Sequence, residues 1–306
     1  MSLTLFIMQC LNGLQLGVLL FLMAAGLTLV FGIMNFVNLA HGSLYMMGAF
    51  IAATVYNHTG SFALAAIAIV PAMLLLGLIV EFVALKTLYD RDHLDQVLAT
   101  FGLILFFNEL ARMIWGPSPY YMEVPEWLSG TVNLFGLAYP AYRFLIIVVG
   151  LVVALGCYLL IHRTRIGMLI RAGSTHRQMV GALGVNIVLL NSLLFGLGAI
   201  LAGIAGLMAG PILSVQPGMG EPILILTMVV IVIGGIGSVR GAFLAALIVG
   251  VVDTVGRTAL PTLLRSLLER STADTAGPAL ASMLIYLVMA AVLAVRPQGL
   301  FPVKHG

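Results

Sequence analysis

Four polar side chains lie together in a part of the sequence that is otherwise strongly apolar. They are Asn35, Asn38, His41 and Tyr45, and runs of apolar residues precede and follow them. If this stretch is helical, the four positions lie on roughly one face. Polar groups at membrane depth are costly unless they face protein or water. The stripe could therefore line a path for a transported molecule, hold two helices together, or form a short loop at the membrane surface.

A second stretch, residues 162–185, is the only extended basic segment of the chain. Its apolar residues recur at helical spacing, at Ile166, Leu169, Ile170, Met179, Val180 and Leu183. A connector between two antiparallel membrane helices needs only about 2–8 residues, so this segment is far longer than a link requires. An apolar face outside the lipid favours a docking site for a soluble cytoplasmic subunit. The alternative is a helix that lies on anionic lipid headgroups.

The composition restricts the class of protein. Of the 306 residues, 61% are hydrophobic and 8% are charged, whereas a soluble domain carries about 25% charged residues. The chain is therefore expected to be a polytopic membrane protein without a separate soluble domain. Its first residues lack the basic group of a cleavable signal peptide. Cys10 and Cys157 lie in apolar runs, which indicates buried thiols and neither a disulfide nor a metal site.

The sequence offers no residues for an enzyme reaction. The nucleotide-binding pattern Gly-x-x-x-x-Gly-Lys-Ser/Thr does not occur, and no group of residues assembles a hydrolytic or metal site. We expect no enzyme activity, no bound cofactor and no nucleic-acid partner. If ATP drives this protein, another chain must bind it.

Nine apolar segments approach or reach the length of about 20 residues that crosses a bilayer. They cover about residues 5–31, 38–56, 62–85, 96–114, 143–161, 187–209, 223–236, 242–255 and 279–295. The expected fold is an all-α polytopic membrane protein with about eight to ten transmembrane helices, some broken or re-entrant, and short loops. All of it forms a single transmembrane domain over residues 1–306.

Individual segments carry further expectations. The sixth is rich in glycine and alanine, which let helices approach closely. The seventh is short and is the candidate for a broken or re-entrant helix. Longer loops are expected at residues 115–142 and 256–278, the second with a short helix at 263–270.

The charges predict the orientation of the chain. Of the fourteen Lys and Arg residues, nine fall on one side when the loops are assigned alternately. That side is predicted to be cytoplasmic, with the N-terminus outside and the C-terminus inside. Two pairs, Glu109 with Arg112 and Asp253 with Arg257, have the spacing of ion pairs on a helix. Glu81 is expected near the inner end of its helix, where it reaches water.

An internal repeat is a weak possibility. His41-Gly-Ser-Leu and Arg240-Gly-Ala-Phe each open an apolar segment from the same predicted side after a break rich in Gly or Asn. Paired interrupted helices can mark a transport site. Glycine-rich breaks also recur for packing reasons alone, and that explanation is favoured here.

Four segments in the same order resemble a known family. They are residues 26–48, which contain Asn-Phe-Val-Asn-Leu-Ala-His-Gly, then 164–173, 234–243 with Gly-Gly-Ile-Gly-Ser-Val-Arg-Gly, and 296–301. Together they resemble the LivH-type permease subunits of ATP-binding-cassette importers for branched-chain amino acids. The resemblance covers nearly the whole chain, and the set of segments is specific although no single one is.

The resemblance implies a multi-pass protein of a bacterial inner membrane with several partners. These are a second, related permease subunit, two cytoplasmic ATPase subunits that bind ATP and Mg²⁺, and a periplasmic binding protein that delivers leucine, isoleucine or valine. It implies that Arg163, Arg165, Gly167, Arg171 and Ala172 belong to the segment that couples ATPase motion to the membrane helices. It also favours Asn35, Asn38, His41 and Tyr45 as residues that face the pathway.

Other functions stay open at this point. Relatives of this family include urea and short-chain amide permeases, which share the Asn-Phe-x-x-Leu-Ala-His-Gly region. A self-sufficient secondary carrier or channel is a different class, and the long cytoplasmic segment 162–185 argues against it. A structural subunit of a membrane enzyme complex is a third, and the polar stripe argues mildly against that.

Overall fold

The chain is helical through almost its whole length in the computed structural model, which describes residues 3–301 except 35, 37, 90, 135, 176 and 266–268. The helices are α1 (Leu3–Met34), α2 (His41–Thr59), α3 (Phe62–Val80), α4 (His93–Trp115), α5 (Ala141–Arg163), α6 (Arg165–Thr175), α7 (Arg177–Ala182), α8 (Ile187–Ala209), α9 (Gly220–Gly234), α10 (Val239–Leu264) and α11 (Arg270–Val295). Short turns η1 (Glu81–Leu85) and η2 (Lys86–Leu88) extend α3, and η3 (Glu126–Leu128) precedes the strands β1 (Thr131–Leu134) and β2 (Leu137–Pro140).

The predicted fold class is confirmed. Each of the nine apolar segments corresponds to a helix, and within the described chain seven helices are long and apolar enough to cross a membrane. The two others are α2, which begins with polar residues, and α9. With 15 residues, α9 is about 22 Å long, which is shorter than the hydrocarbon core of about 30 Å. The seventh segment is therefore short, as predicted.

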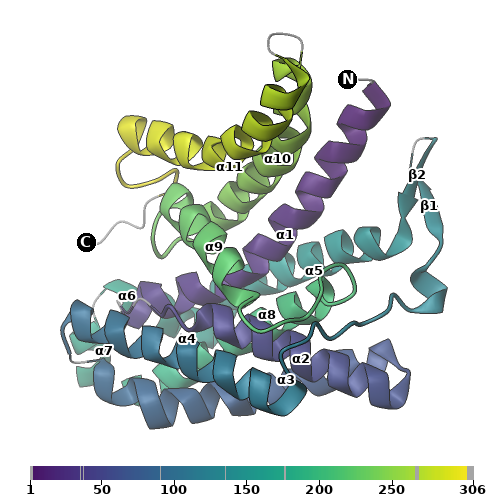
Figure 1. The fold of residues 1–306 in the computed structure, drawn as a ribbon. Helices are drawn as coiled ribbons and strands as arrows, with labels where there is room; N and C mark the ends of the chain where they lie inside the picture. Colours follow the sequence, from purple (N-terminus) through teal and green to yellow (C-terminus); the bar gives the residue numbers. More distant parts are fainter. Residues whose placement is uncertain are drawn as a thin grey trace.

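The helices form two groups that α1 joins (Figure 1). Figure 1 shows α2, α3, α4, α5 and α8 close together, while α10, α11 and the N-terminal half of α1 extend away from them. The core lies where α1 and α2 meet α8, and Phe21, Met23, Tyr45 and Phe50 are fully buried there. By contrast, only 11% of the membrane-length window of α11 is buried within the chain.

Glycines set the closest approaches between helices, as the small residues of α8 predict. A Cβ placed on Gly48 would lie 2.5 Å from the Cα of Gly203, and one on Gly26 would lie 2.9 Å from the carbonyl oxygen of Gly198. Real Cβ atoms do not come so near to a backbone. The contacts of α2 and α1 with α8 therefore depend on the absence of a side chain at these positions.

The long loop predicted at residues 256–278 is wrong, because α10 and α11 continue into it from both sides. Proline lies inside each helix, at positions 261 and 278. Neighbouring groups can satisfy the backbone that a proline frees in a membrane helix, and Arg257 pairs with Asp253 at 2.9 Å along α10. The short helix expected at 263–270 is divided between the end of α10 and the start of α11. Residues 266–268 lie outside the described part of the chain.

The expected exposure of Glu81 is also wrong. Its side chain is 2% exposed, and its carboxylate accepts hydrogen bonds from the hydroxyl groups of Tyr89 at 3.0 Å and Ser192 at 2.9 Å. Buried carboxylates need such donors, and one of them comes from α8, far away in the sequence. The two ion pairs are confirmed, with Arg112 bound to Glu109 at 2.7 Å on the exposed face of α4.

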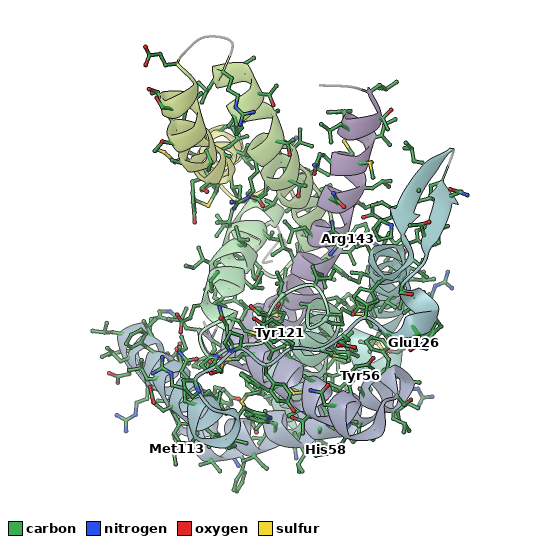
Figure 2. All side chains as sticks on the ribbon, turned by 45° about the vertical axis from the view of Figure 1, so that its right-hand side comes forward. Tyr56, His58, Met113, Tyr121, Glu126 and Arg143 are labelled. Carbon is green, nitrogen blue, oxygen red and sulfur yellow. The ribbon has the colours of Figure 1, made fainter. Side chains whose placement is uncertain are left out.

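The loop between α4 and α5 contains structure that the sequence pattern did not indicate. Strands β1 and β2 form an antiparallel pair in which Thr131 lies opposite Pro140. Figure 2 shows Tyr56 and His58, at the end of α2, at the same end of the molecule as Glu126 in this loop. The loop therefore covers one end of the helical core.

Candidate translocation path and coupling surface

The polar stretch of the sequence is a break between two helices and not one helical face. α1 ends at Met34 and α2 begins at His41, with a turn at residues 39 and 40. Only His41 and Tyr45 of the four predicted path residues share a helix, one turn apart. Asn38 precedes α2, and Asn35 lies outside the described residues.

The start of α2 has no side-chain cap. Its N-cap residue is Ala40, and the turn is closed by backbone bonds, among them the amide of His41 to the carbonyl of Asn38 at 3.3 Å. Asn is among the preferred capping residues, yet Asn38 lies two positions too early and its side chain caps nothing. The side-chain amide of Asn38 therefore takes no part in capping α2.

The polar atoms at this break are enclosed and poorly satisfied. Asn38 is 0% exposed and His41 is 1% exposed. Neither side-chain atom of Asn38 and neither ring nitrogen of His41 forms a hydrogen bond of normal geometry to the described residues. A buried polar group without a partner costs about 1–3 kcal/mol. Such groups in a native protein indicate a bound water or ligand, or a second conformation in which they are satisfied.

His41 lies where three helices meet. Its ring is close to the backbone of Met23 on α1, and its Cε1 atom lies 3.1 Å from the point that a Cβ on Gly26 would occupy. Gly26 is also the residue at which α1 crosses α8. Next to the histidine, a Cβ on Gly42 would lie 2.6 Å from the carbonyl oxygen of Gly220, at the start of α9. The break therefore touches α1, α8 and α9 at once.

The second break in the chain, between α9 and α10, has the opposite character. Ser238 caps α10, because its hydroxyl oxygen accepts a hydrogen bond from the amide of Gly241 at 3.1 Å. Gly241 packs against Gly234 at the end of α9. The starts of α2 and α10 thus lie at opposite ends of α9, and not on one side as the suggested repeat expects. Both breaks use glycine for close packing, as the favoured explanation predicts.

The predicted coupling segment forms two short helices, α6 and α7, between α5 and α8. Arg163, Arg165 and Ala172 are exposed. Two of the apolar residues, Ile170 and Val180, are each 6% exposed and pack inward. The outward residues include several large apolar side chains, which are Ile166, Met168, Met179 and Leu183. This surface combines exposed basic and apolar side chains.

Gly167 and Arg171 hold α6 against the end of α5, although Arg171 is also exposed. Gly167 packs so closely that an added Cβ would meet the carbonyl oxygens of Leu160 and Ile161. The Arg171 guanidinium donates a hydrogen bond to the carbonyl oxygen of Ile161. A cation at the last carbonyls of a helix is favourable. These two residues therefore connect the predicted coupling segment directly to a membrane-length helix.

Sequence reasoning missed a cluster beside this junction. Arg240 donates from Nη2 to Nε2 of His162 at 2.8 Å, and its guanidinium lies 5.3 Å from the centre of the Tyr158 ring. The His162 ring stacks on Tyr158 and its Nδ1 lies 3.0 Å from the carbonyl oxygen of that residue. His162 and Arg240 are 78 positions apart. The sequence therefore showed their residue types but not that the two side chains meet.

A second missed cluster ties α1 to α5 at the other end. Asn12 accepts hydrogen bonds from Arg143 at 2.8 Å and from the Tyr139 hydroxyl at 3.2 Å. Burial raises the pKa of Tyr139 above its usual value, while the charge of Arg143 opposes the shift. The phenol is therefore a neutral donor. Figure 2 shows Arg143 beside α1.

The comparison with protein families decides the class of this chain. Residues 9–293 match the family described as the permease component of branched-chain amino acid transport systems. That match covers almost the whole chain and includes both helix breaks. The chain belongs to this family.

Relatives of the permease come from distant organisms. A protein of Pseudomonas aeruginosa named high-affinity branched-chain amino acid transport system permease protein BraD is 30% identical over 310 residues, which cover 96% of this chain and 95% of the relative. The LivH permease protein of Salmonella typhimurium is 27% identical and covers 84% and 88%. A probable LivH of Methanocaldococcus jannaschii is 24% identical and covers 78% and 76%. No solved structure matches the chain significantly.

Proposed function

We propose that this permease forms part of the membrane pathway of an ATP-driven importer for branched-chain amino acids in a bacterial inner membrane. A periplasmic binding protein delivers the substrate, and separate ATPase subunits supply the energy. The observation that carries the proposal is the family match over residues 9–293, together with relatives that are named as branched-chain amino acid permeases.

The break between α1 and α2 is the best candidate for the substrate path. Asn38 and His41 are polar, enclosed and without normal hydrogen bonds to the described residues. In an alternating-access cycle the surrounding helices separate, and these groups then meet water or the substrate. Tyr45, one turn along α2, and Asn35, by its place in the motif, belong to the same proposed path. In the enclosed state these residues prevent leakage.

The surface of α6 and α7 is the proposed docking site for the ATPase subunits. Arg163, Arg165 and Ala172 contribute its exposed small and basic positions, and Ile166 and Met179 contribute apolar contacts. Motion of α6 passes to α5 through the packing of Gly167 and the hydrogen bond of Arg171 to Ile161. In this proposal Arg163, Arg165 and Ala172 bind the ATPase subunits, whereas Gly167 and Arg171 transmit the motion to α5.

A second permease subunit is the proposed partner within the membrane. The outer faces of α4 and α11 are strongly apolar, and only 22% and 11% of their membrane-length windows are buried within the chain. Such faces contact either lipid or another membrane chain. A related but different chain is the partner that the family resemblance implies.

One experiment tests the whole proposal. The tagged protein is purified from its native membrane, co-purifying chains are identified, and the complex is reconstituted into liposomes with the binding protein. We expect two ATPase chains and a second permease, and uptake of labelled leucine that requires ATP. Uptake of urea or acetamide in place of leucine would show that the substrate is a small amide and not a branched-chain amino acid. Uptake by this chain alone, independent of ATP and abolished by ionophores, would contradict the proposal.

The docking surface has its own test in a charge reversal. Arg165→Glu is expected to reduce recovery of the ATPase chains by about tenfold or more, since an interfacial charge is reversed while the fold is kept. The matched control is Arg91→Glu, which reverses another exposed charge, between η2 and α4.

Arg171→Glu is a separate case, because a carboxylate cannot donate a hydrogen bond to the Ile161 carbonyl. We expect that variant to lower thermal stability as well as ATPase recovery.

A further inference from the structure

Two cavities meet at the cluster of Arg240 and His162, beside the junction of α5 and α6. The first has a volume of about 280 Å³ and is mostly lined by α1, α5, α6 and the start of α10. The second has a volume of about 420 Å³ and lies between α1, α5 and α10. The two share four lining residues, Ile161, His162, Val239 and Arg240. Together they form one site with two compartments, within the usual size range of about 300–1,000 Å³ for ligand pockets.

The first compartment is the more polar of the two and carries the cationic side chains. Its lining includes the guanidinium groups of Arg171 and Arg240 and the hydroxyl of Ser174, and no carboxylate among the described residues. Thr28 also lines it, and the buried hydroxyl of this residue has no hydrogen-bond partner among the described residues. Donors and positive charge without an acidic group suit an anion with several acceptor oxygens.

Arg240 supplies the positive charge at the wall between the compartments. The described residues give it no carboxylate partner. Its hydrogen bond to His162 has the guanidinium as donor, so Nε2 of the histidine accepts. Nδ1 then carries the proton and donates to the carbonyl oxygen of Tyr158. His162 is therefore the neutral support that holds Arg240 over the Tyr158 ring, and it leaves the charge of the arginine uncompensated.

The second compartment is apolar and reaches from the buried Phe21 to the outer surface of the protein. Its lining includes Phe21, Leu151, Leu155, Phe243 and Leu244. Leu155 and Leu244 are 57% and 41% exposed, so the groove opens on the outer face of two membrane-length helices. Figure 1 shows α5 and α10 running in different directions. An apolar chain in the bilayer can enter the groove from the side.

We propose that this site binds an anionic phospholipid. The phosphate occupies the polar compartment at Arg240 and Arg171, and one acyl chain occupies the groove along Leu155. The junction lies at the end of α5 that is followed by the basic segment, which is the depth at which lipid headgroups meet a membrane protein. Basic pockets between membrane helices are suited to anionic headgroups, whereas a choline headgroup would bring a further positive charge to a cationic wall.

The lipid site is distinct from the proposed substrate path. None of the path residues Asn38, His41 and Tyr45 lines either compartment. The bound lipid would contact α5, α6 and α10 together, next to the hydrogen bond between Arg171 and Ile161. The site needs only the membrane location of the chain and does not depend on which solute is transported.

Lipid titration of the purified complex tests the proposal. The complex in detergent is titrated with dioleoyl phosphatidylglycerol or dioleoyl phosphatidylcholine, and bound lipid is counted by native mass spectrometry. We expect phosphatidylglycerol to bind at least tenfold more tightly than phosphatidylcholine. Arg240→Gln removes the charge and Leu155→Trp fills the groove, and each is expected to weaken phosphatidylglycerol binding by about tenfold.

Matched variants separate the site from general effects. Arg112→Gln removes an exposed charge on α4, and Leu105→Trp enlarges a side chain on that helix that is 53% exposed. Both are expected to bind phosphatidylglycerol like the wild type. Thermal unfolding without added phosphatidylglycerol verifies that all four variants are folded. Equal affinity for the two lipids, or unchanged binding in Arg240→Gln or in Leu155→Trp, would overturn the proposal. So would efficient cross-linking of Leu155→Cys to the second permease, because a protein chain would then cover the groove.

Discussion

The break between α1 and α2 and the break between α9 and α10 both place a polar residue and a glycine in the first turn of a helix. At the first break, Asn38 and His41 are buried, and their side chains lack normal hydrogen bonds to the described residues. At the second, Ser238 caps its helix and Arg240 is exposed and bound to His162. The same kind of sequence thus gives an interior site without normal hydrogen bonds and a capped site at the surface.

The difference predicts which of the two breaks rearranges during transport. A helix start whose first turn is capped by a side chain has little to gain from rearrangement. A start without a cap, with enclosed amide and imidazole groups, is less stable than its fold could be, and proteins keep such positions where function needs them. The first break is therefore the better place to look for the transport pathway, and the second for a rigid connection to the coupling segment.

The largest expected effect concerns the feature that the two breaks share, which is their packing on α9. Gly42→Leu and Gly241→Leu each force a side chain against a glycine backbone, at Gly220 and Gly234 respectively. We expect a loss of about 3 kcal/mol or more in stability, at the upper end for overpacking, and little folded protein. Thermal unfolding and the yield of monodisperse protein measure this. The control is Gly156→Leu on α5, where no atom lies near the added Cβ. Equal stability of all three variants would show that the close approaches are not needed.

A smaller effect is expected from Asn38→Leu, and it should separate function from stability. The substitution removes an enclosed amide without described partners, so unfolding temperature stays the same or rises, while ATP-dependent uptake falls by about tenfold. Asn12→Leu is the contrasting control, because Arg143 and Tyr139 both donate to that amide. It should lower stability by about 1–3 kcal/mol. Normal uptake by Asn38→Leu would return the first break to a packing role.

The smallest expected effect is at the cap of the second break. Ser238→Ala removes the acceptor for the Gly241 amide and should cost about 1 kcal/mol of stability. Ser238→Asn keeps a capping oxygen and should restore most of that loss. Thermal unfolding of the two variants beside the wild type measures the difference. If alanine and asparagine behave alike, the second break is not held by its cap, and the contrast with the first break weakens.

Sequence periodicity and composition predicted most of the fold. The bounds of α8 agree with the predicted segment at residues 187–209, and α9 is short as expected. The long extensions of α10 and α11 were missed because prolines 261 and 278 and several charges were interpreted as loop signals. Inside a membrane protein those signals are weaker, since neighbouring groups satisfy the backbone that a proline frees.

The candidate sites could be predicted as segments but not as geometry. The polar stretch and the basic segment were recognisable by residue type alone. The segment bounds placed a break between about residues 31 and 38, but they did not show that α2 begins only at His41, so that Asn38 falls outside the helix. The burial of Glu81 and the hydrogen bonds of Arg171 and Arg240 depend on groups from other helices or from the preceding turn, and one sequence does not show which groups meet. The roles of the predicted path and coupling residues stay predictions.

The crossing of α1 and α8 has a mechanical consequence. At Gly26 and Gly198 the two backbones touch without side chains between them. Interlocked side chains must change rotamer before helices can turn against each other, whereas bare backbones need not. At this crossing no side chain has to change rotamer when the angle between the two helices changes. Because the ring of His41 borders the same point, such a rotation would alter the surroundings of the imidazole.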